Sequence, residues 1–213
     1  MTNDRDDAVA IIDTREIYAG WTKLLLSTVR LPDGRTFKRE IEHHGDAVCV
    51  LPYHPVRKTA VLVRQPRIPV LYAARQSQTL EAIAGVIEDR DAETCAHREA
   101  MEEALLQLDS LDRLFTGWTM PGISTERMHF FLARYSSEAR PPMRGGVDED
   151  EDTVALEVAL ADLARMVDDN TLNDVKTLLL VQSLRLLRPD LFQPAPAQQA
   201  AGNDTLTAPI RLR

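Results

Sequence analysis

The stretch REAMEEALLQL, residues 98–108, places one arginine and three glutamates within six positions and then becomes apolar. On a helix, Glu99, Glu102 and Glu103 share one face within an arc of about 100°. Charged runs of this kind are most often a solvated helix face. These carboxylates also repel one another, with only Arg98 as an adjacent cation, and a divalent ion would turn that repulsion into binding. Taken alone, the stretch leaves both interpretations open.

The composition predicts a globular protein with no nucleic-acid or membrane partner. The 213 residues are 44% hydrophobic, which is enough for a sizeable core, and 25 basic against 33 acidic residues give a net charge of −8. A phosphate substrate would therefore need locally supplied cations. Two cysteines are too few for a disulfide framework, the acidic start is unlike a signal peptide, and no apolar run approaches membrane-spanning length. We expect a cytoplasmic protein.

The elements that must position the glutamates are strands followed by helices. Residues 17–70 read as hairpins, and a further strand ends at Gly85. The glutamate helix begins near Asp91, a natural N-cap. Strand-like stretches flank an acidic, Pro- and Gly-containing loop, and two helices follow at about 160–168 and 172–187. Strands on both sides of one central helix, with helices at the end, suggest an α+β fold or an α/β/α sandwich.

Gly85, the acidic loop after it and REAMEEALL together resemble the Nudix box, whose pattern is Gly, five residues, Glu, seven residues, Arg-Glu-apolar-any-Glu-Glu-any-Gly-apolar. The RE..EE core is intact. The sequence departs from the pattern in three places: the loop is one residue short, Asp91 fills the first acidic position, and Leu105 stands where the family has glycine. Leucine at that position is expected to prolong the helix.

The resemblance extends over roughly residues 17–188. VLVRQPRIP precedes the box, and MPGISTERMHFFLARY, GGVDEDEDTVALEV and DVKTLLLVQSLR follow it in the order of the nucleoside-diphosphate-sugar branch. The resemblance implies an α+β Nudix fold, an α/β/α sandwich with a mixed central sheet plus N-terminal antiparallel strands. It divides the chain into a strand segment at 1–45 and a Nudix hydrolase domain at 46–190. The last residues are low in bulky apolar side chains, which predicts a disordered tail at 191–213. The first hairpins of this branch usually exchange across a two-fold axis, which implies a homodimer.

The resemblance also implies a metal site on the glutamate helix. Glu99 and Glu103 match metal ligands, and the backbone carbonyl of Ala84 is a further expected ligand. Glu102 is either a ligand through water or a partner of Arg98. The implied cofactor is Mg²⁺, with Mn²⁺ as the alternative, because both prefer carboxylate oxygens.

Further residues are expected to bind the substrate or activate water. Arg64 and Arg67 follow a strand, where guanidinium groups can hold phosphate bidentately. Glu81 and Glu126 match glutamates near the nucleotide in the family. Related ADP-ribose enzymes take their general base from the acidic loop, and alignment places Glu149 there, with Glu151 second. Without the box, the same loop would be interpreted as solvated surface.

The implied activity is metal-dependent hydrolysis of the pyrophosphate bond of a nucleoside diphosphate sugar, releasing a nucleoside monophosphate and a sugar phosphate. The position of Pro121 is typical of ADP-ribose enzymes. The short loop, and Ile83 where those enzymes have proline, are more similar to the GDP-mannose hydrolases. GDP-mannose is therefore favoured, with ADP-ribose next. The alternatives are a catalytically degenerate Nudix module that binds a nucleotide as a regulator, and an unrelated acidic helical interaction protein, which the strand-rich first third argues against.

Overall fold

The computed structural model describes residues 8–88, 91–136, 143–145 and 153–193 of the chain. The expected general bases Glu149 and Glu151 lie outside these residues, as does most of the expected tail. The short helix η1 (Pro189–Leu191) buries Leu191 in the core. The described fold thus continues to Gln193, past the point at which the disordered tail was predicted to begin.

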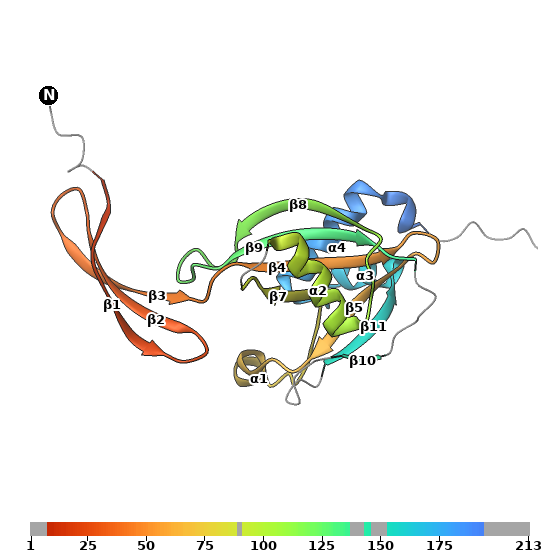
Figure 1. Cartoon of the computed structure of the whole chain (residues 1–213), viewed down its shortest axis with the longest axis horizontal. Coiled ribbons are helices and arrows are strands. Elements are labelled where there is room, and N and C mark those ends of the chain that lie inside the picture. The colour runs from red at the N-terminus through yellow and green to blue at the C-terminus, as the bar shows by residue number, and fades with distance from the viewer. Residues whose placement is uncertain (1–7, 89–90, 137–142, 146–152, 194–213) are drawn as a thin grey trace, which may run out of the picture.

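Three antiparallel strands form a separate sheet at the N-terminus, which projects from the rest of the molecule (Figure 1). They are β1 (Ala10–Ala19), β2 (Lys23–Arg30) and β3 (Thr36–His43). β1 begins before the predicted strand start at residue 17. Ser27 is the only fully buried side chain among the described residues of this sheet, whereas Ile11, Ile17 and Tyr18 are exposed. The sheet therefore has no hydrophobic core of its own.

A second, mixed sheet forms the centre of the molecule, with strand order β10-β11-β5-β4-β9-β8. β4 and β9 run parallel, whereas the other neighbours are antiparallel. Two short strands extend it, β6 beside β5 and β7 beside β4. The strands are β4 (Ala47–His54), β5 (Thr59–Gln65), β6 (Thr79–Glu81), β7 (Ile83–Val86), β8 (Ser110–Trp118), β9 (Arg127–Arg134), β10 (Met143–Gly145) and β11 (Thr153–Ala159).

Helices cover both faces of this sheet (Figure 1). The period of two along β4 sends Val48 and Val50 to the face that packs on α2 (Ala92–Ala104). Cys49 and Leu51 point to the other face, where α3 (Leu160–Asp168) and α4 (Val175–Leu187) pack. This arrangement confirms the predicted α+β sandwich. The helix α1 (Ile68–Ala74), which the sequence pattern did not predict, has no buried residue.

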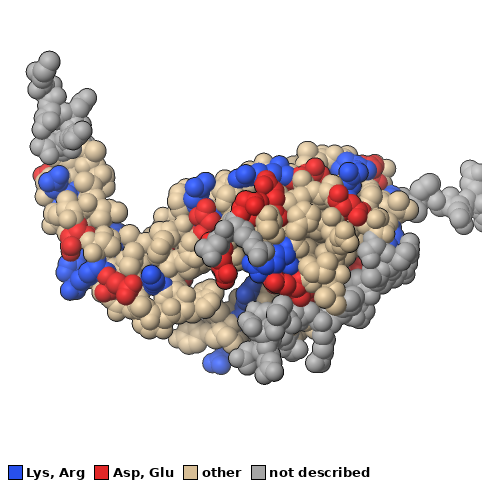
Figure 2. Space-filling model, viewed as in Figure 1, with Lys and Arg blue, Asp and Glu red and all other residues tan. Residues whose placement is uncertain are grey.

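The N-terminal sheet joins the central unit through the end of β3. The Glu42 amide donates to the Ile123 carbonyl at 2.9 Å, and the Thr125 amide donates to the Glu42 carbonyl at 3.0 Å. On the face drawn in Figure 2, acidic and basic side chains are interspersed over both units. None of the helices in the described part of the chain is long and apolar enough to cross a membrane.

Both ends of α2 are defined by specific hydrogen bonds. The Asp91 side chain accepts from the Thr94 amide at 2.9 Å, as expected for the N-cap. The helix ends at Ala104, because Leu105 adopts a left-handed conformation with φ 50° and ψ 37°. The amides of Leu105 and Leu106 then donate back to the Met101 and Ala100 carbonyls. The prediction that Leu105 prolongs the helix is wrong, since leucine here takes the conformation that glycine usually supplies.

This conformation predicts that Leu105→Gly stabilises the protein. A left-handed residue with a side chain costs about 1–2 kcal/mol, and Leu105 is 52% exposed, so little burial is lost. We expect the free energy of unfolding to rise by about 0.5–1 kcal/mol in urea titrations. The matched control is Met101→Gly, because Met101 is 45% exposed in the interior of the same helix. It should lose about 1 kcal/mol. Equal destabilisation by both changes would contradict the strain at Leu105.

Candidate active site

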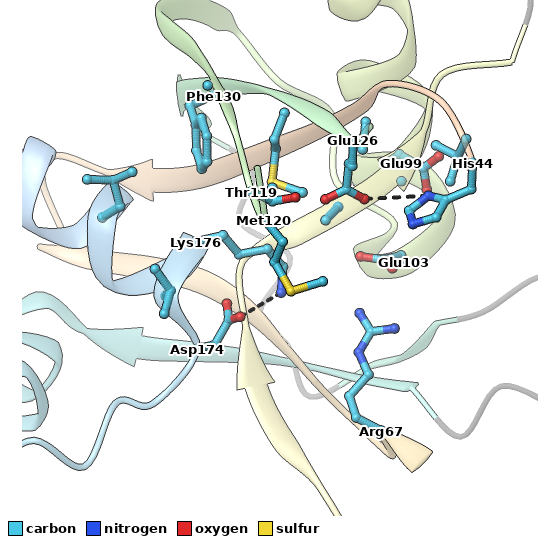
Figure 3. A pocket seen from close by; sticks show the side chains of 18 of the residues that line it. His44, Arg67, Glu99, Glu103, Thr119, Met120, Glu126, Phe130, Asp174 and Lys176 are labelled. Atoms are coloured by element: carbon cyan, nitrogen blue, oxygen red, sulfur yellow. Dashed lines mark hydrogen bonds and ion pairs between the residues drawn. The ribbon is translucent and has the colours of Figure 1, made fainter. Parts of the chain in front are cut away.

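A cavity of about 900 Å³ opens between α2, the end of β8 and the start of α4. This volume is typical of small-molecule sites. Its lining includes Ala84 and Gly85 of β7 and Glu99, Glu102 and Glu103 of α2. Figure 3 shows Glu99 and Glu103 beside this space, with Arg67, Lys176 and Glu126 around it. The cavity therefore brings together most of the residues that the sequence singled out.

Two of the α2 carboxylates, those of Glu99 and Glu102, are held by Arg98. One guanidinium nitrogen lies 2.5 Å from Glu99 Oε1 and the other lies 2.6 Å from Glu102 Oε2. Burial raises the pKa of Glu99, with a further increase from Glu102, while the positive charge of Arg98 opposes both. Within the described ranges, no three Asp, Glu, His or Cys side chains form a preassembled metal cluster. Cation binding at Glu99 and Glu102 would thus compete with Arg98.

Gly85 allows the Glu99 carboxylate to lie directly against the backbone of β7. A Cβ atom at position 85 would lie only 2.0 Å from the Glu99 carboxylate carbon, so any other residue would displace the carboxylate. Ala84 precedes this point and lines the cavity. Carboxylate and backbone carbonyl oxygens are the ligands that hard divalent cations prefer. The chemistry of this donor set fits Mg²⁺ or Mn²⁺.

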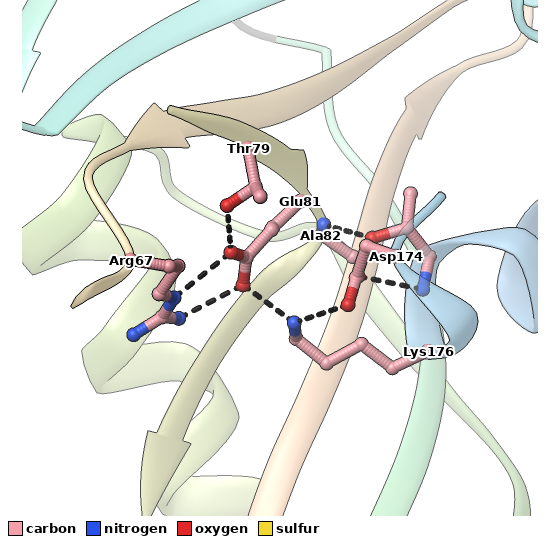
Figure 4. Close-up of polar contacts among 7 residues, drawn as sticks. Arg67, Thr79, Glu81, Ala82, Asp174 and Lys176 are labelled. Carbon is pink, nitrogen blue, oxygen red and sulfur yellow. Dashed lines mark hydrogen bonds and ion pairs between the residues drawn. The ribbon is translucent and has the colours of Figure 1, made fainter. Parts of the chain in front are cut away.

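A network of charged residues supplies cations to another part of the cavity (Figure 4). Glu81 on β6 accepts two hydrogen bonds from Arg67, both at 2.8 Å, and one from Lys176 Nζ at 2.5 Å. Lys176 also donates to Asp174 at 2.8 Å, and Asp174 caps α4 by accepting from the Thr177 amide. Arg67, Lys176 and Asp174 all line the cavity. Lys176 and Asp174 were not predicted from the sequence, although an N-cap residue before a lysine in DVKT indicates such a pair.

Glu81 lies behind the cavity wall. Its residue is only 2% exposed and is not among those lining the cavity. Burial alone would raise its pKa, but the hydrogen bond from Arg67 and the charge of Lys176 outweigh burial and lower the pKa to about 2. Glu81 therefore stays ionised and fixes two cations, a role different from the predicted contact with the nucleotide.

Of the remaining predicted residues, some line the cavity and others do not. Arg64 is exposed on β5 and does not line the cavity, so it is not brought together with Arg67. Glu126 lines the cavity and faces His44, 3.7 Å from the imidazole. Glu149 and Glu151 lie outside the described residues.

Aromatic residues form a further part of the lining that the sequence analysis did not identify. Both tryptophans of the chain, Trp21 and Trp118, line the cavity together with Phe115 and Phe130. Trp21 comes from the turn between β1 and β2 and is 84% exposed. Such flat, exposed rings can stack on a nucleobase, which is worth about 1–3 kcal/mol per base in nucleic-acid complexes. Only the scarcity of aromatic residues in the chain could have drawn attention to them.

Comparison with known proteins agrees with this arrangement. The NUDIX domain family model matches residues 43–179. A GDP-mannose pyrophosphatase of Pectobacterium atrosepticum is 38% identical over 145 residues, which cover 68% of this chain and 75% of that protein. A GDP-mannose pyrophosphatase of Escherichia coli O1:K1 / APEC is 35% identical over 150 residues, covering 70% and 78%.

A solved structure of an ADP compounds hydrolase is similar to this chain with a TM-score of 0.69. The match covers 85% of this chain and 95% of that one at 17% sequence identity. At this identity the similarity shows the fold alone.

The charged network predicts a loss of stability in acid. Because the pKa of folded Glu81 is below its ordinary value of 4.5, its contribution is complete above pH 4.5 and declines as the pH falls towards 2. A shift to about 2 corresponds to about 3 kcal/mol, of which about 2 kcal/mol is lost by pH 3. Urea unfolding of wild type and Glu81→Gln at pH 7 and pH 3 should show their difference shrinking by this amount. The exposed Glu40→Gln is the control, and an unchanged Glu81→Gln difference would contradict the network.

Proposed function

The chain belongs to the NUDIX family and is a hydrolase of that family, and from this premise we propose its substrate. We infer that it hydrolyses the pyrophosphate bond of GDP-mannose, with ADP-ribose as the next candidate. The observation that carries the proposal is one cavity that combines the α2 carboxylates with the cations Arg67 and Lys176. The GDP-mannose pyrophosphatases at 35–38% identity support the choice of sugar nucleotide.

We assign the metal site to the Ala84 carbonyl, Glu99 and Glu103, with Mg²⁺ as the cofactor and Mn²⁺ as the alternative. Glu102 either contributes through water or releases Arg98 when the cation binds. A bound divalent cation would neutralise phosphate charge and lower the pKa of a water molecule. Gly85 supports this assignment, because it lets Glu99 lie against the backbone beside Ala84.

The substrate is held by groups around the metal site. A pyrophosphate repels an incoming nucleophile, so its oxygens must be neutralised and its position fixed. Arg67 and Lys176, held by Glu81, provide two positive charges for these oxygens. Glu126 offers a carboxylate acceptor for N–H or O–H groups of the nucleotide, and Trp21 and Trp118 offer flat surfaces for the base.

The general base is assigned to Glu149, with Glu151 as the second candidate, from the order of motifs in the sequence. A carboxylate outside the metal helix can take the proton from the attacking water without losing a metal ligand. Arg64 is left out of the proposed site because its exposed side chain lies outside the cavity.

We also propose a homodimer in which residues 1–45 form the contact and residues 46–190 form the hydrolase domain. The N-terminal sheet has a single buried side chain, Ser27, and exposes Ile11, Ile17 and Tyr18. A sheet with no core of its own needs a partner surface. The two buried free cysteines, Cys49 and Cys95, are consistent with a cytoplasmic location.

A catalytically degenerate module that binds a nucleotide is the competing function. Its best support was Leu105, which was expected to disturb the end of the metal helix. Since α2 ends at Ala104, with Leu105 in the left-handed conformation that glycine usually supplies, that support is removed. Incubation with Mg²⁺ and a panel of nucleoside diphosphate sugars, followed by chromatography of the monophosphates, tests the proposal. GMP and mannose 1-phosphate are expected, and no turnover of any member of the panel would favour the regulator.

The metal assignment predicts that Glu99→Gln and Glu103→Gln each lower activity by at least about 100-fold. Each change removes a ligand charge while keeping the shape, and the cation stabilises the transition state by several kcal/mol. The matched control is Glu93→Gln, on the exposed first turn of the same helix, with activity within twofold of wild type. Initial rates over a Mg²⁺ series measure the effect. Wild-type rates for Glu103→Gln would refute the assignment.

The base assignment predicts that Glu149→Gln lowers kcat by about 10²- to 10⁴-fold while the Mg²⁺ dependence stays nearly unchanged, because general-base catalysis contributes about this factor. Steady-state kinetics of Glu149→Gln and Glu151→Gln, measured side by side, separate the two candidates. A loss confined to Glu151→Gln would transfer the role to that residue, and full activity in both would remove the base from this loop.

The dimer proposal predicts a mass of about twice 23.9 kDa in solution. Sedimentation equilibrium at micromolar concentration measures it. Replacing the exposed Ile11 and Ile17 by lysine should shift the mass towards the monomer, because a charge in an apolar contact is costly. A fully active monomer for the unmodified chain would rule the dimer out.

A further inference from the structure

His44 lies at the junction between the N-terminal sheet and the cavity. It follows β3 directly, lines the cavity, and has a side chain that is 16% exposed. Its Nδ1 lies 3.7 Å from Glu126 Oε2, and its Nε2 lies 4.0 Å from Glu42 Oε1 (Figure 3 shows the Glu126 contact). The ring also packs against Trp21, with 5.5 Å between ring centroids. One imidazole therefore contacts two carboxylates and the exposed tryptophan of the cavity.

The backbone holds Glu42 and Glu126 near each other whatever the charge of His44. The end of β3 is bonded to residues 123 and 125 through the amide and carbonyl of Glu42. Two like charges at such a junction repel each other unless a cation lies between them. Within the described ranges, no lysine or arginine forms an ion pair with either carboxylate. The imidazole of His44 is the group that lies between the two carboxylates.

The neighbouring histidine has a different environment. His43 Nδ1 lies 2.7 Å from the Thr125 hydroxyl, and His43 does not line the cavity. The charged groups facing His44 are Glu42 from β3 and Glu126 from the segment before β9, and Trp21 from the β1–β2 turn is uncharged. His43 is thus a matched control of the same residue type, one position away.

We propose that His44 is a positioning residue whose imidazole, lying between Glu42 and Glu126 and against Trp21, fixes Glu126 and Trp21 for binding of the nucleotide. This inference rests on the proposed function, because it assigns Glu126 and Trp21 to the substrate. His44 orients the Glu126 carboxylate and holds the indole of Trp21 beside the cavity. Because Glu126 and Trp21 are assigned to nucleotide binding, loss of His44 acts on substrate binding and leaves the chemical step largely intact.

Steady-state kinetics with GDP-mannose and Mg²⁺ test this role. We expect His44→Gln to raise KM by about tenfold, because the group between the two carboxylates is lost, with kcat within about threefold of wild type. His44→Arg keeps hydrogen-bond donors between the carboxylates and should restore most of the affinity, while His43→Gln should stay within twofold. A KM for His44→Gln equal to that of His43→Gln would overturn the proposal.

A double-mutant cycle tests whether His44 acts through Glu126. In the Glu126→Gln background, removal of His44 should change KM by less than about twofold, because the carboxylate it orients is absent. The full tenfold effect in that background would show that His44 acts independently of Glu126 and would overturn the proposed positioning.

The wild-type reaction separates this inference from the proposed function. If wild type hydrolyses GDP-mannose and the His44 variants behave like wild type, only the positioning role is lost. If wild type hydrolyses no nucleotide sugar, the proposed function is lost, and tryptophan fluorescence decides the His44 contact without substrate. In a Trp118→Phe background, His44→Gln should change the emission of Trp21, because the imidazole packs against the indole, whereas His43→Gln should leave it unchanged. Identical emission in the two histidine variants would overturn the contact.

Discussion

The buried, ionised carboxylate of Glu81 requires hydrogen-bond donors around it, and the arrangement of the site depends on this requirement. Arg67, Thr79 and Lys176 all donate to it. Arg67 stands at the start of α1, and Lys176 lies in the first turn of α4. Satisfying one charge therefore fixes the directions of two helices relative to β6. The same hydrogen bonds hold the side chains of Arg67 and Lys176 at the cavity wall. Interactions that stabilise the fold therefore also place positively charged groups where a phosphate substrate needs them.

The position of α2 depends on a second constraint, the packing of its apolar face and its acidic face. Ala96 and Ala100 pack on the sheet beside Val48 and Ile83, and their small size brings the helix close to β7. At that closeness Glu99 lies directly against Gly85. The apolar and acidic faces of α2 are thus coupled, because the packing of the alanines determines where the carboxylates meet the strand.

Features set by short sequence spacings could be predicted from the sequence. The acidic face of α2, its cap at Asp91 and the presence of strands before and after it along the chain follow from local patterns and match the structure. Features that depend on contacts between distant residues could not be predicted. Glu81 meets Lys176 across 95 positions, and Trp21 reaches a cavity built mainly by residues after position 43. The end of α2 was mispredicted because hydrogen bonds to Met101 and Ala100 outweigh the intrinsic preference of Leu105.

The N-terminal sheet has few contacts with the central unit, and this affects the cooperativity of unfolding. Its strands share almost no buried apolar surface with the central unit, and two backbone hydrogen bonds at Glu42 mark the junction. Segments with few buried contacts open at lower free energy than the global unfolding transition. In a separated protomer the amide protons of β1 to β3 would therefore exchange with solvent well before those of β4 and β9. A single melting temperature would then average two units of unequal stability and describe neither.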